Sequence, residues 1–342
     1  MTDTCRAWIL ANFSLFRLAL FLCCIGYFVV GYHWFKPSRR ELRAGLMAVW
    51  VQFALGVVLD GLVVRSGAWR YRPLPFSLGG VPLDLHVDWS MIWGCFLVWL
   101  YSRERVFWRG PKFVAVYLGL WTVLTLAFDS AVAWQLLFLE EFTRWWWLAD
   151  LGFLLGVQGV TLWVYHAQLY PVRDPFWAAW SARVRSILYV GSLAYFFYSY
   201  GPSVVLSLTD GWTVPPLLGL GDRRVLVAAL IGPLALGTWA VWEFTGQGFG
   251  TPVPLDPPRR LVTTGPYVYV RNPQQLSGLL LAVVLLLYHP TPFMLAYVID
   301  MALILSTLIH LFEDAELARR YGAEYAGYRS VVKNWLPRWR TA

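Results

Sequence analysis

Two short polar segments in the C-terminal part of the chain carry residue types that a small charged ligand with a flat ring would need. The first, GPYVYVRNP (265–273), places Arg271 and Asn272 directly ahead of an apolar stretch. A residue that precedes proline avoids the helical region, so this pattern predicts a fixed loop. The second segment follows two apolar stretches and holds Glu313 and Tyr325. A guanidinium, an amide, a carboxylate and phenol rings together can bind a ligand that carries both charges and an aromatic ring.

The second segment also has helical spacing. One series of positions is Glu313, Leu317, Arg320 and Glu324, and an adjacent stripe is His310, Asp314, Tyr321, Tyr325 and Tyr328. Residues three or four apart share a helix face. We therefore expect a single helix to present both the carboxylates and the tyrosines.

The order of these two segments around a helical hairpin resembles the C-terminal module of the integral-membrane methyltransferases. This is the family of isoprenylcysteine carboxyl methyltransferase and the phospholipid N-methyltransferases. The positions that carry the resemblance are Gly265, Pro266, Tyr267, Tyr269, Val270, Arg271, Asn272, Pro273, Glu313, Leu317, Gly322, Glu324, Tyr325, Tyr328 and Pro337. Two positions depart from the family pattern: Gln275 stands near where a tyrosine is usual, and Asp314 replaces the second glutamate of a pair.

The resemblance implies S-adenosylmethionine as cofactor and methyl transfer to a lipophilic acceptor, a carboxylate, thiolate or amine, at the cytoplasmic membrane face. The cofactor-binding residues that it implies are Gly265, Tyr267, Val270, Asn272, Pro273, Glu313, Asp314, Tyr325 and Tyr328. The catalytic residues that it implies are Arg271, Asn272 and Glu313, with Arg271 orienting an anionic acceptor.

Composition predicts an all-α, polytopic integral membrane protein. Hydrophobic residues make up 58% of the 342 residues and charged residues only 14%, which leaves no soluble domain of useful size. We expect about nine transmembrane helices, each near the length that crosses a bilayer. They are Phe13–Gly31, Ala44–Val64, Leu85–Tyr101, Phe113–Phe128, Trp145–Tyr165, Ile187–Leu208, Val225–Trp242, Pro273–Tyr288 and Phe293–Phe312.

Lysine and arginine gather in alternate loops. They are concentrated after the first, third, fifth and seventh expected spans and in the tail. This bias predicts an outside N-terminus and a cytoplasmic C-terminus, in the inner membrane if the source is bacterial. The net charge of +8 then reflects this bias and an affinity for anionic headgroups, and we expect no nucleic-acid partner. The scattered cysteines and histidines predict no metal site.

The N-terminal half, residues 1–182, is expected to be a membrane bundle of unknown role ahead of the methyltransferase-like domain, residues 183–342. Its segment SGAWRYRPLPFSLGGVPLDLHVDW resembles a pattern in membrane carotenoid-modifying proteins. Asp60, Asp84 and Asp88 are acids near apolar spans, and an intramembrane acid is a candidate functional group that could protonate an alkene. For Asp84 and Asp88 we favour a simpler role as helix caps in an interfacial loop.

Three alternative functions stay open at this stage. One is an NADPH-dependent membrane enzyme similar to the sterol reductases, although Glu313 and Asp314 are poorly suited to bind phosphates. The second is a carotenoid- or isoprenoid-modifying enzyme that acts through the N-terminal half. The third is a non-enzymatic lipid-binding protein. The oligomeric state is not indicated by the sequence.

Overall fold

The computed structural model describes residues 8, 11–72, 77–104, 111–129, 138–207, 222–253 and 255–337. It divides into two compact units, Met1–Pro171 and Val172–Ala342. The boundary expected from the sequence, after residue 182, lies inside a helix of the second unit.

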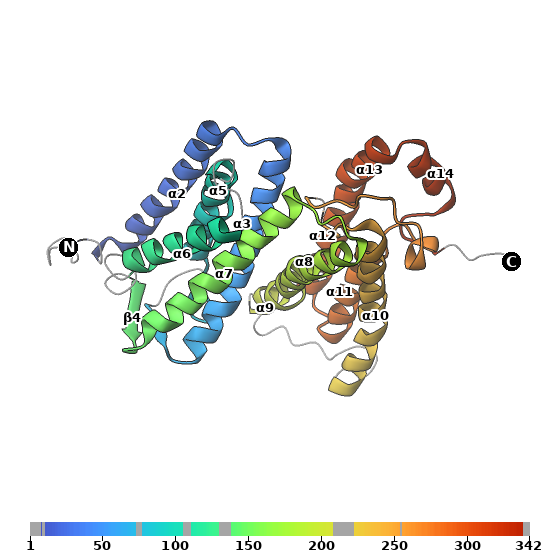
Figure 1. Cartoon of the computed structure of the whole chain (residues 1–342). Coiled ribbons are helices and arrows are strands. Elements are labelled where there is room, and N and C mark those ends of the chain that lie inside the picture. Colours follow the sequence, from blue (N-terminus) through green and yellow to red (C-terminus); the bar gives the residue numbers. More distant parts are fainter. Residues whose placement is uncertain are drawn as a thin grey trace. The chain divides into compact units, whose positions relative to one another are not determined.

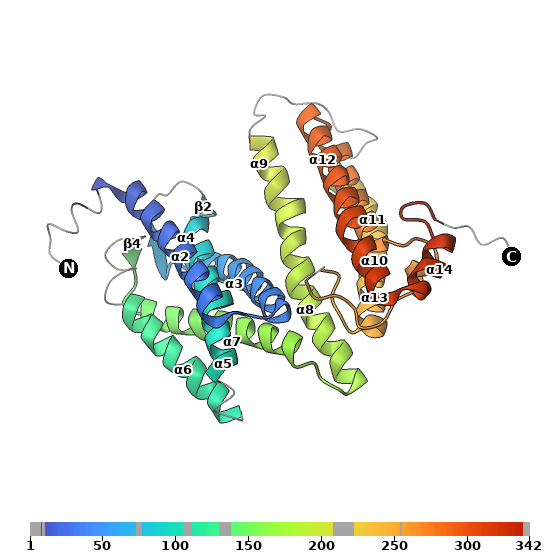
Figure 2. The same cartoon turned by 90° about the horizontal axis from the view of Figure 1, so that it is seen from above.

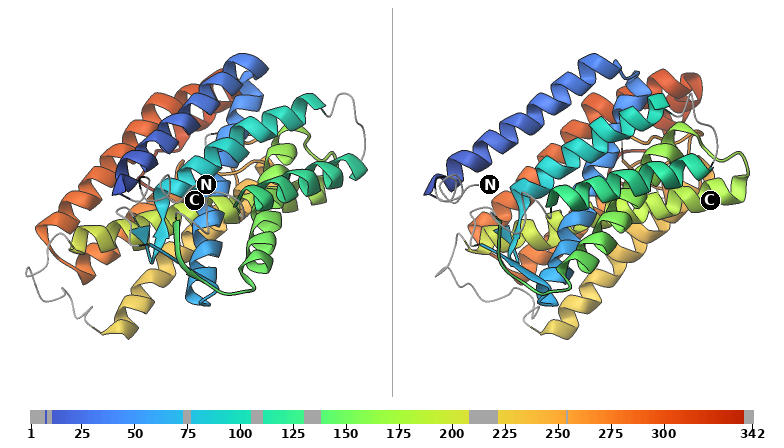
Figure 3. Two further views of the ribbon diagram at one scale, coloured as in Figure 1. Left: turned by 90° about the vertical axis from the view of Figure 1, so that its left-hand side faces the viewer. Right: turned by 60° about the vertical axis from the view of Figure 1, so that its left-hand side comes forward.

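Helices dominate the first unit (Figure 1). They are α2 (Phe13–Phe35), α3 (Arg39–Arg65), α4 (Leu83–Met91), α5 (Val98–Glu104), α6 (Pro111–Phe128) and α7 (Trp146–Leu169). The π-helical turn η1 (Ile92–Leu97) joins α4 to α5, so that these elements form one continuous rod. Helix α2 packs along this rod (Figure 3).

Two small antiparallel pairs of strands accompany these helices, and the sequence did not predict them. Strand β1 (Trp69–Tyr71) pairs with β4 (Leu139–Phe142), and β2 (Ser77–Leu78) pairs with β3 (Val81–Pro82). Strand β1 follows α3 and β3 precedes α4, so the segment between these helices is tied down by backbone hydrogen bonds on both sides.

The second unit is also a helical bundle. It contains α8 (Pro175–Tyr195), η3 (Phe196–Tyr200), α9 (Gly201–Ser207), α10 (Arg223–Gly248), α11 (Pro273–Tyr288), α12 (Pro292–Leu308), η6 (Ile309–Glu313), α13 (Asp314–Tyr321) and α14 (Ala323–Val331). A short 3₁₀ turn, η5 (Gly265–Val268), lies in the loop before α11. Helix α11 packs against both α10 and α12 (Figure 2).

Local sequence explains where the helices of the second unit begin. Asp174 caps α8 and Asp222 caps α10 through side-chain hydrogen bonds to the backbone. Thr291 caps α12 in the same way, and Pro292 follows at the first helical position, where a missing N–H costs nothing. The α10–α11 contact is close, since the Ser277 hydroxyl donates to the Pro233 carbonyl at 2.7 Å. These features fix α10 to α12 as the frame that carries the site.

The all-α membrane architecture is confirmed. Among the described residues, five helical stretches are long and apolar enough to cross a bilayer: Phe13–Phe35, Arg39–Arg65, Trp146–Leu169, Arg223–Gly248 and Pro292–Tyr321. The apolar helices Val114–Phe128 and Pro273–Tyr288 are shorter. Each of the nine expected spans lies within a helical stretch, except that Trp145 directly precedes α7 and Leu208 lies outside the described residues; several of the helices extend well beyond the expected ends. The number of spans and their orientation stay predictions.

Side-chain exposure agrees with a membrane environment. On α10, Val227, Ile231 and Leu234 are all more than half exposed. Rows of exposed apolar side chains are costly in water and favourable against lipid. The second unit therefore presents an apolar outer face around a more polar site.

Candidate functional site

Gly265 opens the loop that leads into the site. Its φ of 59° lies in the left-handed region that favours glycine. A side chain there would also collide with α10, because an added Cβ would lie 2.9 Å from Glu243 Cγ. The next residue but one, Tyr267, is buried, and its ring packs against Phe244 of α10 with the centroids 6.0 Å apart. This end of the loop is therefore anchored to α10.

The other end of the loop passes directly into α11. Pro273 occupies the first turn of α11, and Asn272 is the residue that precedes it. Asparagine at such a position usually hydrogen-bonds the helix backbone, but the Asn272 side chain makes no capping bond. Its Nδ2 is buried and has no hydrogen-bond partner in the described chain. This amide is therefore available to a ligand.

Arg271 lies beside Asn272 and is only 8% exposed. Its Nη2 is 3.4 Å from Asp314 Oδ2, and its guanidinium lies 5.9 Å from the centre of the Tyr325 ring. The backbone N–H of Arg271 donates to the Lys333 carbonyl at 2.9 Å. Its Nε, however, is buried without a partner among the described residues. One face of the guanidinium is thus fixed by the protein while one N–H stays unused.

Asp314 is the centre of this cluster. It is 5% exposed and accepts a hydrogen bond from the Tyr325 hydroxyl. Arg329 Nη2 lies 3.6 Å from the same carboxylate oxygen that faces Arg271. Two cations and one phenol therefore balance a single buried carboxylate, which makes Asp314 a positioning group for Arg271 and Tyr325.

The single helix expected over this region is not present, and the prediction was wrong. Helix α13 ends at Tyr321, Gly322 turns the chain with φ of 53°, and α14 begins at Ala323 (Figure 1). In one straight helix, Asp314 and Tyr325 would lie about 16 Å apart along the axis. The turn folds α14 back, so that the Tyr325 hydroxyl reaches Asp314.

Glu313 points to a different partner. Its Oε2 accepts a hydrogen bond from Gln275 Nε2 at 3.2 Å. Gln275, which departs from the family pattern, thereby holds this carboxylate from the first turn of α11.

Burial, together with the nearby Glu313 carboxylate, raises the pKa of Tyr267 well above its ordinary value. Tyr267 is therefore a neutral phenol beside Glu313.

The tyrosines of α14 complete the cluster. The Tyr328 hydroxyl donates to the Tyr267 carbonyl at 2.8 Å, and the rings of Tyr325 and Tyr328 are 6.4 Å apart. Burial and the hydrogen bond to Asp314 raise the pKa of Tyr325, and burial raises that of Tyr328. Both phenols stay protonated donors at neutral pH.

The long loop between α10 and η5 is held from two sides. Arg320 Nη1 and the Tyr321 hydroxyl both donate to the Pro258 carbonyl, at 2.8 and 2.7 Å. Arg185 of α8 forms a partly buried ion pair with Asp256 at 2.9 Å. The loop that leads from α10 to the site is therefore held in place at Asp256 and Pro258.

The structure brings together most residues that the sequence proposed. Arg271, Asp314 and Tyr325 contact one another, while Tyr328 contacts Tyr267. Val270 and Pro273 are buried on either side of Arg271 and Asn272 in the chain. Gly265 lies against Glu243 at the far end of the loop.

Two residues that contact the site, Glu243 and Arg329, were not predicted from the sequence. Glu243 accepts a hydrogen bond from Thr264, and an acid inside the apolar α10 was the signal that could have identified it. Arg329 carried no such signal, because it reaches Asp314 only through the turn at Gly322.

The expected role of two N-terminal aspartates is corrected. Asp84 and Asp88 both lie within α4, whose cap position is Pro82, and neither caps it. Asp84 instead forms an ion pair with Arg17 of α2, and Asp88 is buried. Sequence could not show this, because Arg17 is distant along the chain.

Comparison with known families gives a match within the second unit. Residues 227–324 match the family described as phospholipid methyltransferase. The match spans α10, the site loop, the α11–α12 hairpin and α13, and it ends one residue before Tyr325. No curated protein and no solved structure matches the chain. The resemblance drawn from the sequence is confirmed to this extent: the C-terminal part of the chain is similar to the phospholipid methyltransferase family over residues 227–324.

Proposed function

We propose that the second unit transfers a methyl group from S-adenosylmethionine to a lipophilic acceptor at the cytoplasmic membrane face. The main support is a pair of buried, unpartnered N–H groups, Arg271 Nε and Asn272 Nδ2, beside carboxylates and tyrosines. Buried donors without partners cost free energy, and a bound ligand relieves that cost.

The residues fit the chemical groups of this cofactor. Its carboxylate matches the Asn272 amide, which leaves Arg271 Nε for an anionic acceptor. Its sulfonium or ribose hydroxyls match Glu313, whose hydrogen bond in the described chain is to Gln275. Its adenine matches the aromatic walls that Tyr267 and Tyr328 supply.

When bound, S-adenosylmethionine supplies an electrophilic methyl group on a positively charged sulfur. The protein's own contribution is positioning and exclusion of water, since methyl transfer is an in-line displacement in which charge is neutralised. Asp314 holds Arg271 in one orientation, and Arg271 Nε then orients an anionic acceptor. Gln275 holds Glu313 on the opposite side of the loop. None of these residues has to act as a strong base if the acceptor arrives as a carboxylate or thiolate.

The first test compares two ligands on the purified full-length protein in detergent, with thermal unfolding as the readout. S-adenosylhomocysteine should stabilise the protein by about 2.7 kcal/mol at 100 times its dissociation constant, and NADPH should not stabilise it. Stabilisation by NADPH alone would reject the methyltransferase assignment in favour of a reductase.

A matched pair of variants then locates the site. Glu313→Gln should weaken binding of S-adenosylhomocysteine, because it removes the carboxylate while keeping shape and size. Glu324→Gln makes the same change at an exposed position of α14 and should leave binding unchanged. If Glu313→Gln binds S-adenosylhomocysteine as tightly as Glu324→Gln and the unaltered protein do, the cofactor binds elsewhere.

A further inference from the structure

The first unit contains a buried acid and histidine that methyl transfer does not use. His86 Nε2 lies 2.9 Å from Asp60 Oδ2, and the two side chains are 7% and 1% exposed. Asp60 also accepts hydrogen bonds from Trp69 Nε1 at 2.9 Å and from the Tyr71 hydroxyl at 2.7 Å. Such a set of donors suits a carboxylate that acts as a fixed acceptor.

This arrangement fixes the histidine tautomer. Because Asp60 accepts, Nε2 carries the proton, and Nδ1 of the neutral ring keeps its lone pair. In the described part of the chain, the hydrogen bond of the His86 ring is the one that Nε2 makes to Asp60. The absence of a side chain at Gly56 lets the ring pack this closely against α3, since an added Cβ would lie 2.8 Å from Nδ1. The ring therefore presents one open acceptor.

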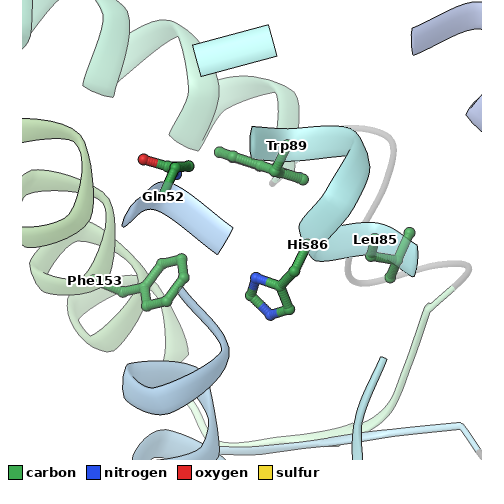
Figure 4. A pocket seen from close by; sticks show the side chains of 5 residues that line it. All are labelled: Gln52, Leu85, His86, Trp89 and Phe153. Carbon is green, nitrogen blue, oxygen red and sulfur yellow. The ribbon is translucent and has the colours of Figure 1, made fainter. Parts of the chain in front are cut away.

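That acceptor faces a small pocket. Gln52, Leu85, His86, Trp89 and Phe153 line it, and in Figure 4 one ring nitrogen of His86 points into the space toward Gln52. The space has room for a single water-sized group. Gln52, Leu85 and His86 are buried at its floor, whereas Trp89 and Phe153 are partly exposed. The pocket is thus polar at the bottom and aromatic at the mouth.

The charges around the pocket select the ligand class. Asp150 of α7 is buried near Asp60, and one of its carboxylate oxygens has no partner in the described residues. A carboxylate ligand would add a negative charge to this region. An ammonium group would lose its water shell, and none of the five side chains that line the pocket is a carboxylate. A neutral hydroxyl meets neither cost and can donate to Nδ1.

We propose that this pocket binds the terminal hydroxyl group of a lipophilic alcohol taken from the membrane, with His86 Nδ1 as hydrogen-bond acceptor and Asp60 as its positioning residue. The hydroxyl fills the water-sized floor, and the apolar chain leaves between Trp89 and Phe153. This site belongs to the first unit alone and does not depend on the function proposed for the second.

The test uses full-length protein in lipid nanodiscs and a photoreactive 1-dodecanol that carries a diazirine in its chain. Irradiation followed by peptide mass spectrometry should place the label on the peptides that contain Gln52, Trp89 or Phe153. Unlabelled 1-dodecanol should compete about tenfold better than its methyl ether, which cannot donate a hydrogen bond to Nδ1. Dodecylamine and dodecanoic acid should compete no better than the ether.

Two variants separate binding from folding. His86→Phe removes the acceptor and should abolish labelling, but it also breaks the bond to Asp60. Phe153→Trp narrows the mouth from α7 and leaves the bond between Asp60 and His86 in place, so loss of labelling in this variant cannot be ascribed to that network. Equal competition by the ether, labelling confined to other peptides, or full labelling of Phe153→Trp would each overturn the proposal.

Discussion

Replacing Arg271 with alanine tests whether the buried ion pair organises the site. Arg271 and Asp314 are each less than a tenth exposed, and the atoms that pair are 3.4 Å apart. The substitution removes the cation but leaves the carboxylate in place. An isolated buried charge is far more costly than an isolated charge in water.

The size of the effect follows from the partners that Asp314 keeps. Removing one member of a buried pair typically costs about 3 to 5 kcal/mol. Asp314 retains the Tyr325 hydroxyl and the half-exposed Arg329, so we expect the lower end, about 3 kcal/mol. Removing Asp314 as well relieves the uncompensated charge. The double variant Arg271→Ala/Asp314→Ala should therefore be more stable than the sum of the single losses predicts, by about 1 to 3 kcal/mol.

Equilibrium unfolding of the full-length protein in mixed micelles measures these free energies. The matched control is Arg319→Ala on α13, where the ion pair with Glu316 lies at the surface and Arg319 is 66% exposed. An exposed pair contributes no more than about 1 kcal/mol. If Arg271→Ala costs no more than Arg319→Ala, or if the double variant is additive, the ion pair does not organise the site. Arg271→Ala should also lose methyl transfer, measured with labelled S-adenosylmethionine and a lipid extract.

Four other outcomes are expected. Gly265→Ala should lower the free energy of unfolding by at least about 1 to 2 kcal/mol, because the positive φ and the nearby Glu243 both oppose a Cβ. The control Gly327→Ala adds a Cβ in open space on α14 and should raise the free energy of unfolding by up to about 1 kcal/mol. The same unfolding titration measures both variants. Tyr325→Phe keeps the ring but removes the hydroxyl that donates to Asp314, so the same titration should show a free energy of unfolding about 1 to 3 kcal/mol lower. Since the pKa of Tyr325 is raised, affinity for S-adenosylhomocysteine in the unaltered protein should stay constant up to about pH 9, and a steep loss by pH 8 would contradict this. Reporters inserted in the 249–264 loop and fused after the C-terminus should both be cytoplasmic, and an outside signal from either would refute the orientation.

Sequence patterns predicted those parts of the structure that depend on local information. Apolar stretches of membrane length became helices, and α11 begins and ends at the residues expected, because a proline starts it and His289 and Pro290 end it. The GPYVYVRNP segment (265–273) was also placed correctly as a loop that leads into α11. These features need only neighbouring residues to decide them.

Features that depend on distant contacts were not predictable in the same way. The helical stripe through Tyr325 continued past Gly322, and only packing of α14 onto Asp314 shows that the chain turns there. His86 was one of several scattered histidines until Asp60, from another helix, was found beside it. Gln275 was seen as a departure from a pattern, and its contact with Glu313 requires the α11–α12 hairpin to form first.

The position of α14 in the chain sets the order in which the site is assembled during synthesis. Tyr325, Tyr328 and Arg329 follow every expected membrane span, and so does the Lys333 carbonyl that receives the Arg271 N–H. The spans can therefore enter the bilayer while Asp314 and Arg271 still lack these partners. Closure of the candidate site is then a late step of biogenesis, and a chain that stops before α14 would reach the membrane with its apolar helices in place but without the groups that complete the cluster around Asp314.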